Sequence, residues 1–167
     1  SGWDWAPTLP DMGIFRSVEL RGYDSDRLEH VLLSQSHHDG VVDLSLRVTT
    51  AHRRGLCIRA EMDGQEIMLE NGEGVIRIEN PKLWWARGYG AQPLYDLTVT
   101  LEDGGRVIDT VHKRIGLRTL SVSTAPDADG KGSEFCFVLN GVKIFSMGAN
   151  YVPMDSLLPR ITPERQK

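Results

Sequence analysis

The feature of this sequence that most constrains its fold is a recurring alternation of apolar and polar residues, interrupted by two-residue turn signals. Residues 41–49 place Val42, Leu44, Leu46 and Val48 on one face, as a half-buried strand does. Asp-Gly or Asn-Gly between such segments is the strongest short-range hairpin signal, because both turn residues need a positive φ. The pattern predicts antiparallel β-sheet.

The alternation extends over most of the chain. Seven strands are expected, at residues 27–35, 41–49, 56–62, 74–78, 94–101, 107–113 and 117–122. The turn signals between them are Asp39-Gly40, Asp63-Gly64, Asn80-Pro81 and Asp103-Gly104-Gly105. This count and spacing are typical of immunoglobulin-like sandwiches. We therefore predict an all-β fold, an immunoglobulin-like β-sandwich of about seven strands spanning residues 24–121.

The flanking residues are expected to belong to neighbouring domains. Residues 14–20 alternate as a strand whose partners are missing, and residues 124–133 form a polar linker rich in turn-forming residues. A further hairpin is expected around Asn140-Gly141. Residues 162–164, Thr-Pro-Glu, have the composition of a helix N-terminus. We expect the sequence to be an internal segment of a larger protein.

Composition limits which classes of partner and which cellular compartment are expected. The 167 residues carry a net charge of −4, with 19 basic residues spread along the chain, which disfavours nucleic acids and anionic membranes as partners. Cys57 and Cys136 lie far apart in alternating apolar segments, which suits small buried thiols better than a disulfide framework. These thiols favour a reducing compartment, and the cytoplasm is the expected location.

Metal and cofactor sites are not expected. His37 and His38 are neighbours on a strand and point to opposite faces, and no second His or Cys pair stands at ligand spacing. The glycine-containing segments 72–74 and 88–90 lack the following helix that a phosphate-binding loop needs. No nucleophile-elbow pattern occurs in the sequence. The chain therefore offers no catalytic constellation of its own.

Aromatic residues are concentrated in two loops. Trp84, Trp85, Tyr89 and Tyr95 precede or begin a predicted strand, where their rings either pack against the core or stack on a sugar. Packing is the favoured interpretation for these four. Residues 3–5, Trp-Asp-Trp, lie in a loop where large rings beside a carboxylate have little core to fill. That arrangement favours a binding role.

Six motifs together resemble the β-mannosidases of glycoside hydrolase family 2. They are GWDWAP at 2–7, GIFR at 13–16, WWARGYG at 84–90, QPLYDLTV at 92–99, GLR at 116–118 and GANYVPMD at 148–155. The resemblance covers nearly the whole chain in the right order, and it favours the β-mannosidase branch over the galactosidase or glucuronidase branches. Ala6 and Met147 depart from the family pattern, which usually has Gly and Lys there.

The resemblance implies a multidomain retaining exo-glycosidase that hydrolyses terminal β-D-mannosides. Residues 1–23 would end a sugar-binding-like jelly roll, residues 24–121 would form the sandwich, and residues 122–167 would be a linker, a hairpin and the start of a TIM barrel. The acid/base of this family is the Glu of an Asn-Glu pair, and no Asn-Glu pair occurs here. No catalytic residue, metal or cofactor is therefore expected in this chain.

The resemblance also implies a substrate-binding role for three residues and a set of partners. Trp3 would stack on the terminal sugar, Asp4 would bind its hydroxyl groups, and Asn150 would follow the first barrel strand at the active-site face. Asp155 has the same location, but a structural role in a turn explains it equally well. The expected partners are a carbohydrate substrate and the intramolecular jelly-roll and TIM-barrel domains.

Three alternatives stay open at this point. The sandwich itself would bind carbohydrate if Trp84, Trp85 and Tyr89 formed a flat exposed platform, and burial of the two tryptophans would argue against that role. A second alternative is a generic interaction module in a non-catalytic protein. A third is another family 2 glycosidase, such as a β-galactosidase, β-glucuronidase or exo-glucosaminidase.

Overall fold

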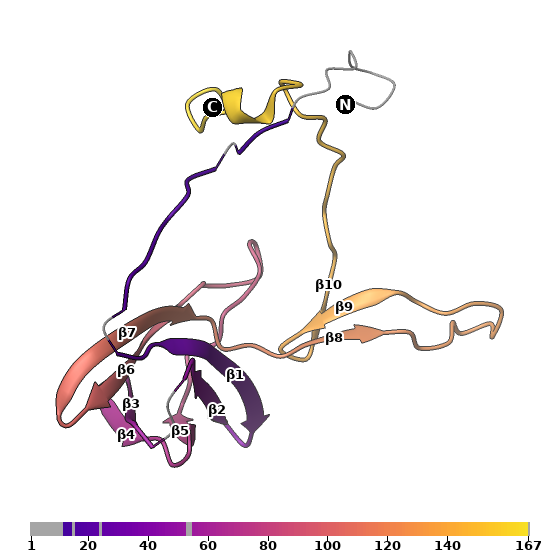
Figure 1. Cartoon of the computed structure of the whole chain (residues 1–167). Coiled ribbons are helices and arrows are strands. Elements are labelled where there is room, and N and C mark those ends of the chain that lie inside the picture. The colour runs from indigo at the N-terminus through magenta and orange to yellow at the C-terminus, as the bar shows by residue number, and fades with distance from the viewer. Residues whose placement is uncertain (1–11, 15, 24, 53–54, 167) are drawn as a thin grey trace. The chain divides into compact units, whose positions relative to one another are not determined.

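The computed structural model describes residues 12–14, 16–23, 25–52 and 55–166 (Figure 1). These residues form ten strands and one short 3₁₀ helix. The elements are β1 (Leu28–His38), β2 (Val41–Thr50), β3 (Cys57–Met62), β4 (Gln65–Met68), β5 (Glu73–Glu79), β6 (Tyr95–Asp103), β7 (Arg106–Ile115), β8 (Leu120–Ser123), β9 (Cys136–Leu139), β10 (Val142–Ile144) and η1 (Leu158–Arg160).

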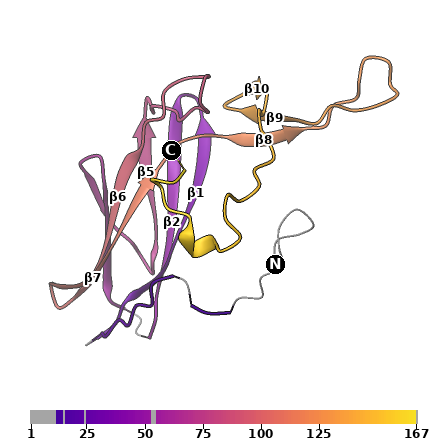
Figure 2. The same ribbon diagram turned by 90° about the horizontal axis from the view of Figure 1, so that it is seen from above.

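Strands β1 to β7 form a two-layer antiparallel sandwich. One sheet has the order β1-β2-β5 and the other has the order β4-β3-β6-β7. Figure 2 shows strands of both sheets running alongside one another, as in an aligned sandwich. The chain changes sheet between β2 and β3, between β4 and β5, and between β5 and β6. The prediction of an all-β, immunoglobulin-like sandwich is confirmed.

The core lies between the two sheets because each strand turns alternate residues inward. Val42, Leu44, Leu46 and Val48 of β2 are all buried, as their alternation predicts. They pack with residues of the other strands in one cluster, whose members from β3, β5 and β6 are Ile58, Ala60, Met62, Ile76, Ile78, Leu97, Val99 and Leu101. Burial of these side chains supplies the main driving force for folding.

The hairpin turns have the backbone conformation that their sequences predict. Asp39 and Gly40, which join β1 to β2, have φ values of 46° and 74°. The same two positive φ angles recur at residues 63–64, between β3 and β4, and at residues 140–141, between β9 and β10. Asp, Asn and Gly tolerate this region better than other residues do, which fixes the position of each hairpin.

The sandwich has seven strands, as predicted, but one of the seven is not the strand that the sequence predicts. Strand β4 was missed because its four residues are mostly exposed and do not alternate. Residues 117–122, predicted as the seventh sandwich strand, instead contribute β8 to a separate sheet of order β10-β9-β8. Pairing with β9 explains the difference, because Leu120–Ser123 align with residues 136–139, while Leu117 forms only an isolated bridge to Leu83 and stays in the sandwich core.

The strand expected at residues 14–20 is also absent from the described part of the chain. Residues 16–20 form no strand, and Val18 and Leu20 are largely exposed. A strand needs a neighbour for its backbone hydrogen bonds, and no described strand pairs with this segment. Because the expected partners of this strand belong to a preceding domain, the strand stays a prediction.

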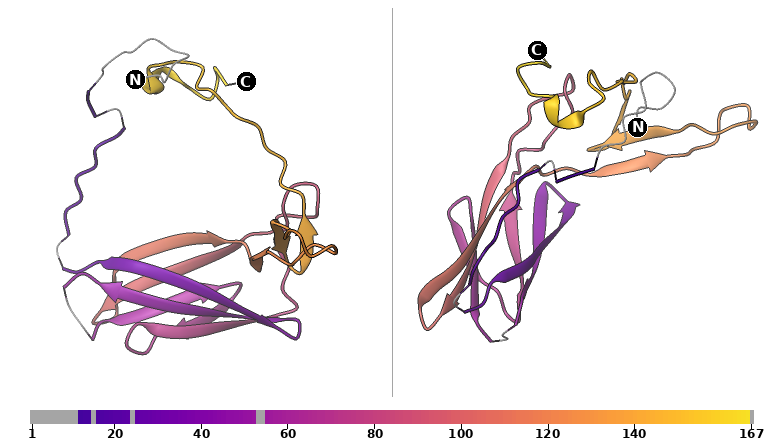
Figure 3. Two further views of the ribbon diagram at one scale, coloured as in Figure 1. Left: turned by 90° about the vertical axis from the view of Figure 1, so that its right-hand side faces the viewer. Right: turned by 45° about the horizontal axis from the view of Figure 1, so that its top comes forward.

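Contacts between Cα atoms divide the chain into two units. One unit is Tyr23–Ser146, which holds the sandwich and the β8–β10 sheet, both visible in Figure 3. The other unit is made of Ser1–Gly22 and Met147–Lys167. In this second unit the Gln166 N–H donates to the Thr162 carbonyl oxygen at 3.2 Å, the hydrogen bond of a first helical turn.

Candidate functional site

Only one of the three predicted substrate-binding residues lies in the described part of the chain. Trp3 and Asp4 lie outside the described residues. Asn150 is exposed and follows an extended segment that continues from β10. Its unit also contains the described residues 12–14 and 16–22.

Asp155 is the centre of a local ion-pair network. Its Oδ1 accepts the Leu157 N–H at 3.0 Å, and its Oδ2 accepts a guanidinium N–H of Arg165 at 3.1 Å. Arg160 adds an ion pair at 3.3 Å. The Leu157 N–H, followed by the Arg165 guanidinium, holds the pKa of the Asp155 carboxyl below its ordinary value. These partners fit a structural role in the turn that precedes η1.

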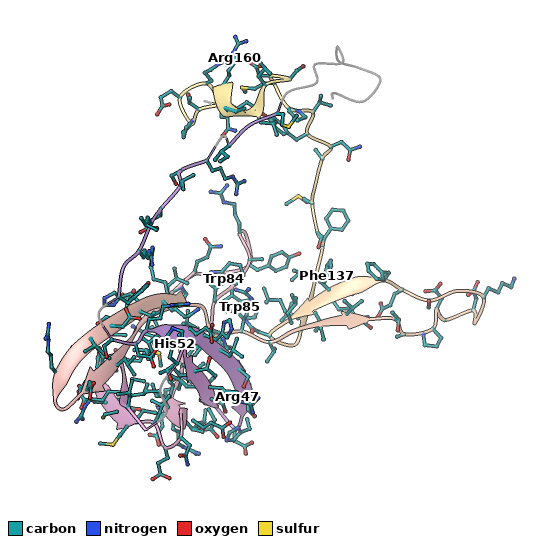
Figure 4. The ribbon with its side chains drawn as sticks, in the orientation of Figure 1. Arg47, His52, Trp84, Trp85, Phe137 and Arg160 are labelled. Carbon is teal, nitrogen blue, oxygen red and sulfur yellow. The ribbon has the colours of Figure 1, made fainter. Side chains whose placement is uncertain are left out.

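The double-tryptophan loop, residues 81–93, connects β5 to β6 and is anchored through Trp84 (Figure 4). The Trp84 N–H donates to the Leu117 carbonyl oxygen at 2.8 Å, and its carbonyl oxygen accepts from Asn140 Nδ2 at 3.0 Å. Arg118 lies over the Trp84 ring, 4.6 Å from the centroid. A Cβ on Gly116 would come within 2.9 Å of Trp84 Cγ, so the ring is closely packed.

The tip of the same loop contacts the segment that follows β10. Trp85 donates its N–H to the Ala91 carbonyl oxygen at 2.9 Å, and a Cβ on Gly90 would lie 2.9 Å from Trp85 Cγ. The Tyr89 hydroxyl oxygen accepts the Phe145 N–H at 2.8 Å. The loop is therefore folded back on its own tryptophan and holds the backbone just beyond β10.

The loop joins the sandwich to the β8–β10 sheet, and we call residues Trp84, Trp85, Tyr89 and Asn140 the bracket. Asn140 has a φ of 48° in its hairpin turn, and its Oδ1 accepts the Thr119 N–H at 2.9 Å. One side chain thus links β9–β10, the start of β8 and the loop. The Asn-Gly signal predicts the turn, but nothing local in the sequence indicates the contact with Trp84.

The tryptophans do not form a flat exposed platform. Both are half-buried, and the face of Trp84 carries the Arg118 guanidinium. Tyr89 is the most exposed of the three rings, and its hydroxyl is engaged by Phe145. The favoured interpretation, that these aromatic residues pack the loop, agrees with the geometry better than a sugar-stacking surface does.

A polar cluster on β1 fixes the chain where it leaves β7. Gln35 Nε2 donates to the Gly116 carbonyl oxygen at 3.2 Å, and Gln35 Oε1 accepts the Arg118 N–H at 3.0 Å. His37 Nε2 lies 3.0 Å from the same Oε1 and therefore donates to it, since an amide oxygen only accepts. Burial lowers the pKa of His37, which keeps the imidazole neutral near pH 7.

Two aspartates hold the start of β1. Asp26 is buried, and its Oδ1 accepts the backbone N–H groups of Arg27 and His52 at 2.8 and 3.1 Å. Asp109 of β7 accepts the Leu28 N–H at 2.8 Å. A buried carboxylate at 2% exposure could suggest catalysis, but backbone donors satisfy this one, which indicates a structural role.

Other classes of site receive little support from the described residues. They contain no group of three or more His, Cys, Asp or Glu side chains arranged to hold a metal ion. Cys57 and Cys136 are free thiols and are half-buried rather than fully buried. No helix among the described residues has the length and apolar character needed to cross a bilayer.

Sequence comparison finds similarity along the whole chain. A sequence model of glycosyl hydrolases family 2 matches residues 32–118. Beta-mannosidase B of Neosartorya fischeri is 36% identical over 179 residues, which cover 99% of this chain and 21% of that protein. Beta-mannosidase B of Thermothelomyces thermophilus is 36% identical over 98% of this chain and 20% of its own length. The chain thus spans about a fifth of these curated relatives.

Solved structures also resemble this chain in fold. The crystal structure of a β-D-mannosidase from Dictyoglomus thermophilum matches 98% of this chain and 22% of its own, with a TM-score of 0.78 and 33% identity. A β-glucuronidase from Ruminococcus gnavus matches 74% of this chain with a TM-score of 0.56 and 19% identity. The second likeness concerns the fold alone.

Proposed function

Because this chain belongs to glycosyl hydrolases family 2, we propose that it is the sandwich segment of a β-mannosidase-like exo-glycosidase. The full-length enzyme would hydrolyse terminal β-D-mannosides with retention of configuration. The observation that carries the proposal is the 33% identity to the Dictyoglomus β-D-mannosidase over 98% of the chain, at a TM-score of 0.78. The β-glucuronidase match, at 19% identity, favours no particular sugar.

The proposed domain assignment follows the expectation from sequence. Residues 1–23 would end a jelly-roll domain, residues 24–121 would be the sandwich, and residues 122–167 would be the linker, the hairpin and the start of the TIM barrel. The division of the chain near Tyr23 supports the first boundary. The same division keeps residues 122–146 with the sandwich, where Asn140 and Phe145 hydrogen-bond to the double-tryptophan loop.

The role of the segment itself would be structural. A retaining glycosidase needs two carboxylates roughly 5 to 5.5 Å apart, one as acid/base and one as nucleophile. The Asn-Glu pair that carries the acid/base in this family does not occur in the 167 residues. Glu70-Asn71 and Glu79-Asn80 have the reverse order and lie at turns of the sandwich. Catalysis would require polypeptide outside this segment.

Substrate binding would involve both ends of the segment. Trp3 would present an aromatic face to the apolar face of the terminal sugar, and Asp4, ionised near pH 7, would accept hydrogen bonds from its hydroxyl groups. Asn150, exposed beyond β10, would offer an amide to the same sugar. The resemblance to β-mannosidases supports this convergence, because the motifs at residues 2–7 and 148–155 both belong to it.

The proposal is tested by comparing aryl glycosides as substrates of the full-length enzyme and of the 167-residue chain. We expect the full-length enzyme to hydrolyse an aryl β-D-mannoside with a higher kcat/KM than the matching galactoside, glucuronide or glucosaminide. The chain alone should release no aryl alcohol from any of them. Preference for another sugar would overturn the mannoside assignment, and turnover by the chain alone would overturn the structural role.

A further inference from the structure

Two Asn-Gly pairs of this chain occupy turns with the same backbone conformation. Asn71-Gly72 lies between β4 and β5, and Asn140-Gly141 lies between β9 and β10. The φ angles are 53° and 81° in the first pair and 48° and 80° in the second. The sequence contains no other Asn-Gly pair. Any difference in the chemistry of the two pairs must therefore come from what surrounds them.

An asparagine followed by glycine is prone to spontaneous deamidation. The glycine backbone nitrogen attacks Cγ of the asparagine amide, the bond from Cγ to the side-chain nitrogen breaks, and ammonia leaves. The resulting succinimide then adds water at either carbonyl and opens to aspartate or isoaspartate. Glycine has no side chain to hinder the attack, and asparagine is among the thermolabile residues. The net reaction consumes water and releases ammonia, so it needs no enzyme or cofactor.

The amide of Asn140 is held on both sides by the bracket and its neighbours. Its Oδ1 accepts the Thr119 N–H at 2.9 Å, and its Nδ2 donates to the Trp84 carbonyl oxygen at 3.0 Å. The backbone N–H of Asn140 also donates to the Thr119 carbonyl oxygen at 3.0 Å. Cγ cannot turn towards the Gly141 nitrogen without breaking the two side-chain bonds. Deamidation at this pair therefore requires the bracket to open first.

The amide of Asn71 has no such restraint. Asn71 is exposed, and its side chain makes no hydrogen bond with the described part of the chain. Its turn is closed by two backbone bonds between Glu70 and Glu73, each 2.9 Å long, and the Gly72 carbonyl oxygen accepts the Val48 N–H at 2.7 Å. These bonds restrain the backbone and leave the amide free to rotate. Attack at this pair therefore needs only a local adjustment of the turn.

The fold also requires the glycine of the first pair. A Cβ added to Gly72 would clash with the Val48 carbonyl oxygen, and the positive φ of Gly72 adds strain for any other residue. A Cβ added to Gly141 would meet nothing within 4 Å. The turn between β4 and β5 therefore keeps the residue that makes Asn71 reactive, because a substitution there would disturb the contact with β2.

We propose that Asn71 is the site at which the folded chain deamidates, and that the bracket protects the chemically identical pair Asn140-Gly141. The product adds a negative charge between Glu70 and Glu73, where like charges repel. As isoaspartate it also lengthens the backbone of the turn by a methylene group. The reaction needs no glycoside, so the inference does not depend on which sugar the full-length enzyme prefers.

The experiment follows deamidation at each asparagine by peptide mass spectrometry while the 167-residue chain is kept at mildly alkaline pH, folded or unfolded in urea. Digestion with pepsin in acid suppresses further reaction during analysis. In the folded chain we expect Asn71 to react at least about tenfold faster than Asn140, because two side-chain hydrogen bonds must break at Asn140. In urea the two rates should be similar. Equal rates in the folded chain, faster reaction at Asn140, or no reaction at either pair would overturn the proposal.

A pair of variants tests whether the bracket is the source of the protection. W84A removes the ring that anchors the loop, and it should raise the rate at Asn140 about tenfold and leave the rate at Asn71 unchanged. W85A is the matched control, because the Trp85 N–H bonds to Ala91 within the loop and should affect Asn140 less. An unchanged rate at Asn140 in W84A, or an equal rise at both asparagines, would overturn the role of the bracket. If W84A does not fold, the comparison of the folded and unfolded chain still decides.

Discussion

Two tyrosine hydroxyls accept backbone N–H groups at 2.8 Å and form a natural pair of probes. Tyr89 accepts from Phe145, within the bracket, and Tyr95 accepts from Lys82 at the base of the loop. We expect Y89F to accelerate hydrogen exchange at the Phe145 amide by about twofold to tenfold, since such a bond contributes roughly 0.5–1.5 kcal/mol.

Y95F is the matched control for this measurement by NMR. It should accelerate exchange at the Lys82 amide and leave Phe145 unchanged, and Y89F should do the reverse. If Y89F left the Phe145 amide as protected as before, the contact between the loop tip and the segment beyond β10 would not exist in solution. Tyr89 would then not belong to the bracket.

Single residues also mark the limit of what the sequence can reveal. The positive φ of Asn140 follows from local turn chemistry, so the sequence predicts it. Its bond to the Trp84 carbonyl joins residues 56 positions apart and carries no local signal. Gln35 is similar, because a polar residue in a strand gives no indication that it will hold Gly116 and Arg118.

At the scale of the element, hairpins were predictable and sheet membership was not. Alternation and Asp-Gly turns located β1, β2, β3 and β6 well, because both signals are local. The separation of β8 from the sandwich depends on its pairing with β9, which lies beyond a long linker. Such pairing is a property of the tertiary structure, and the pattern of β8 itself does not reveal it.

The ion pair between Glu134 and Lys143 should make the stability of the β8–β10 sheet depend on pH in acid. The Lys143 ammonium, and then the Ser123 hydroxyl, hold the pKa of the Glu134 carboxyl below its ordinary value of 4.5. A carboxyl whose pKa is lowered in the folded state stabilises that state at every pH above the carboxyl's ordinary pKa. This contribution is lost as pH falls below 4.5 and through the folded-state value.

We therefore expect amides of β8 and β9 to lose exchange protection as the pH falls from neutral to below 4.5, after correction for intrinsic exchange rates. E134Q should remove most of this loss of protection at low pH, because the amide keeps the size of the side chain but does not titrate. E73Q is the control, since Glu73 pairs with Arg47 in the sandwich. If β8 and β9 still lose exchange protection at low pH in E134Q, then Glu134 is not the group whose titration destabilises this sheet.

For the whole molecule, the sequence predicted the family and the fold more completely than the site. Motifs distributed from residue 2 to residue 155 identify a family because their order and spacing are unlikely to recur by chance. The sugar site depends on how the two ends of the segment meet other domains. Trp3 and Asp4 lie outside the described residues, so their roles stay predictions.

The most direct test of the account is the effect of D4N on hydrolysis of an aryl β-D-mannoside by the full-length enzyme. A charge-assisted hydrogen bond contributes about 1.5–3 kcal/mol, and about 1.4 kcal/mol corresponds to a tenfold change in rate. We predict that D4N lowers kcat/KM about tenfold to a hundredfold without changing the thermal midpoint, while D11N, in the same N-terminal stretch, leaves kcat/KM unchanged. An unchanged kcat/KM in D4N would contradict the claim that this segment contributes to the sugar site.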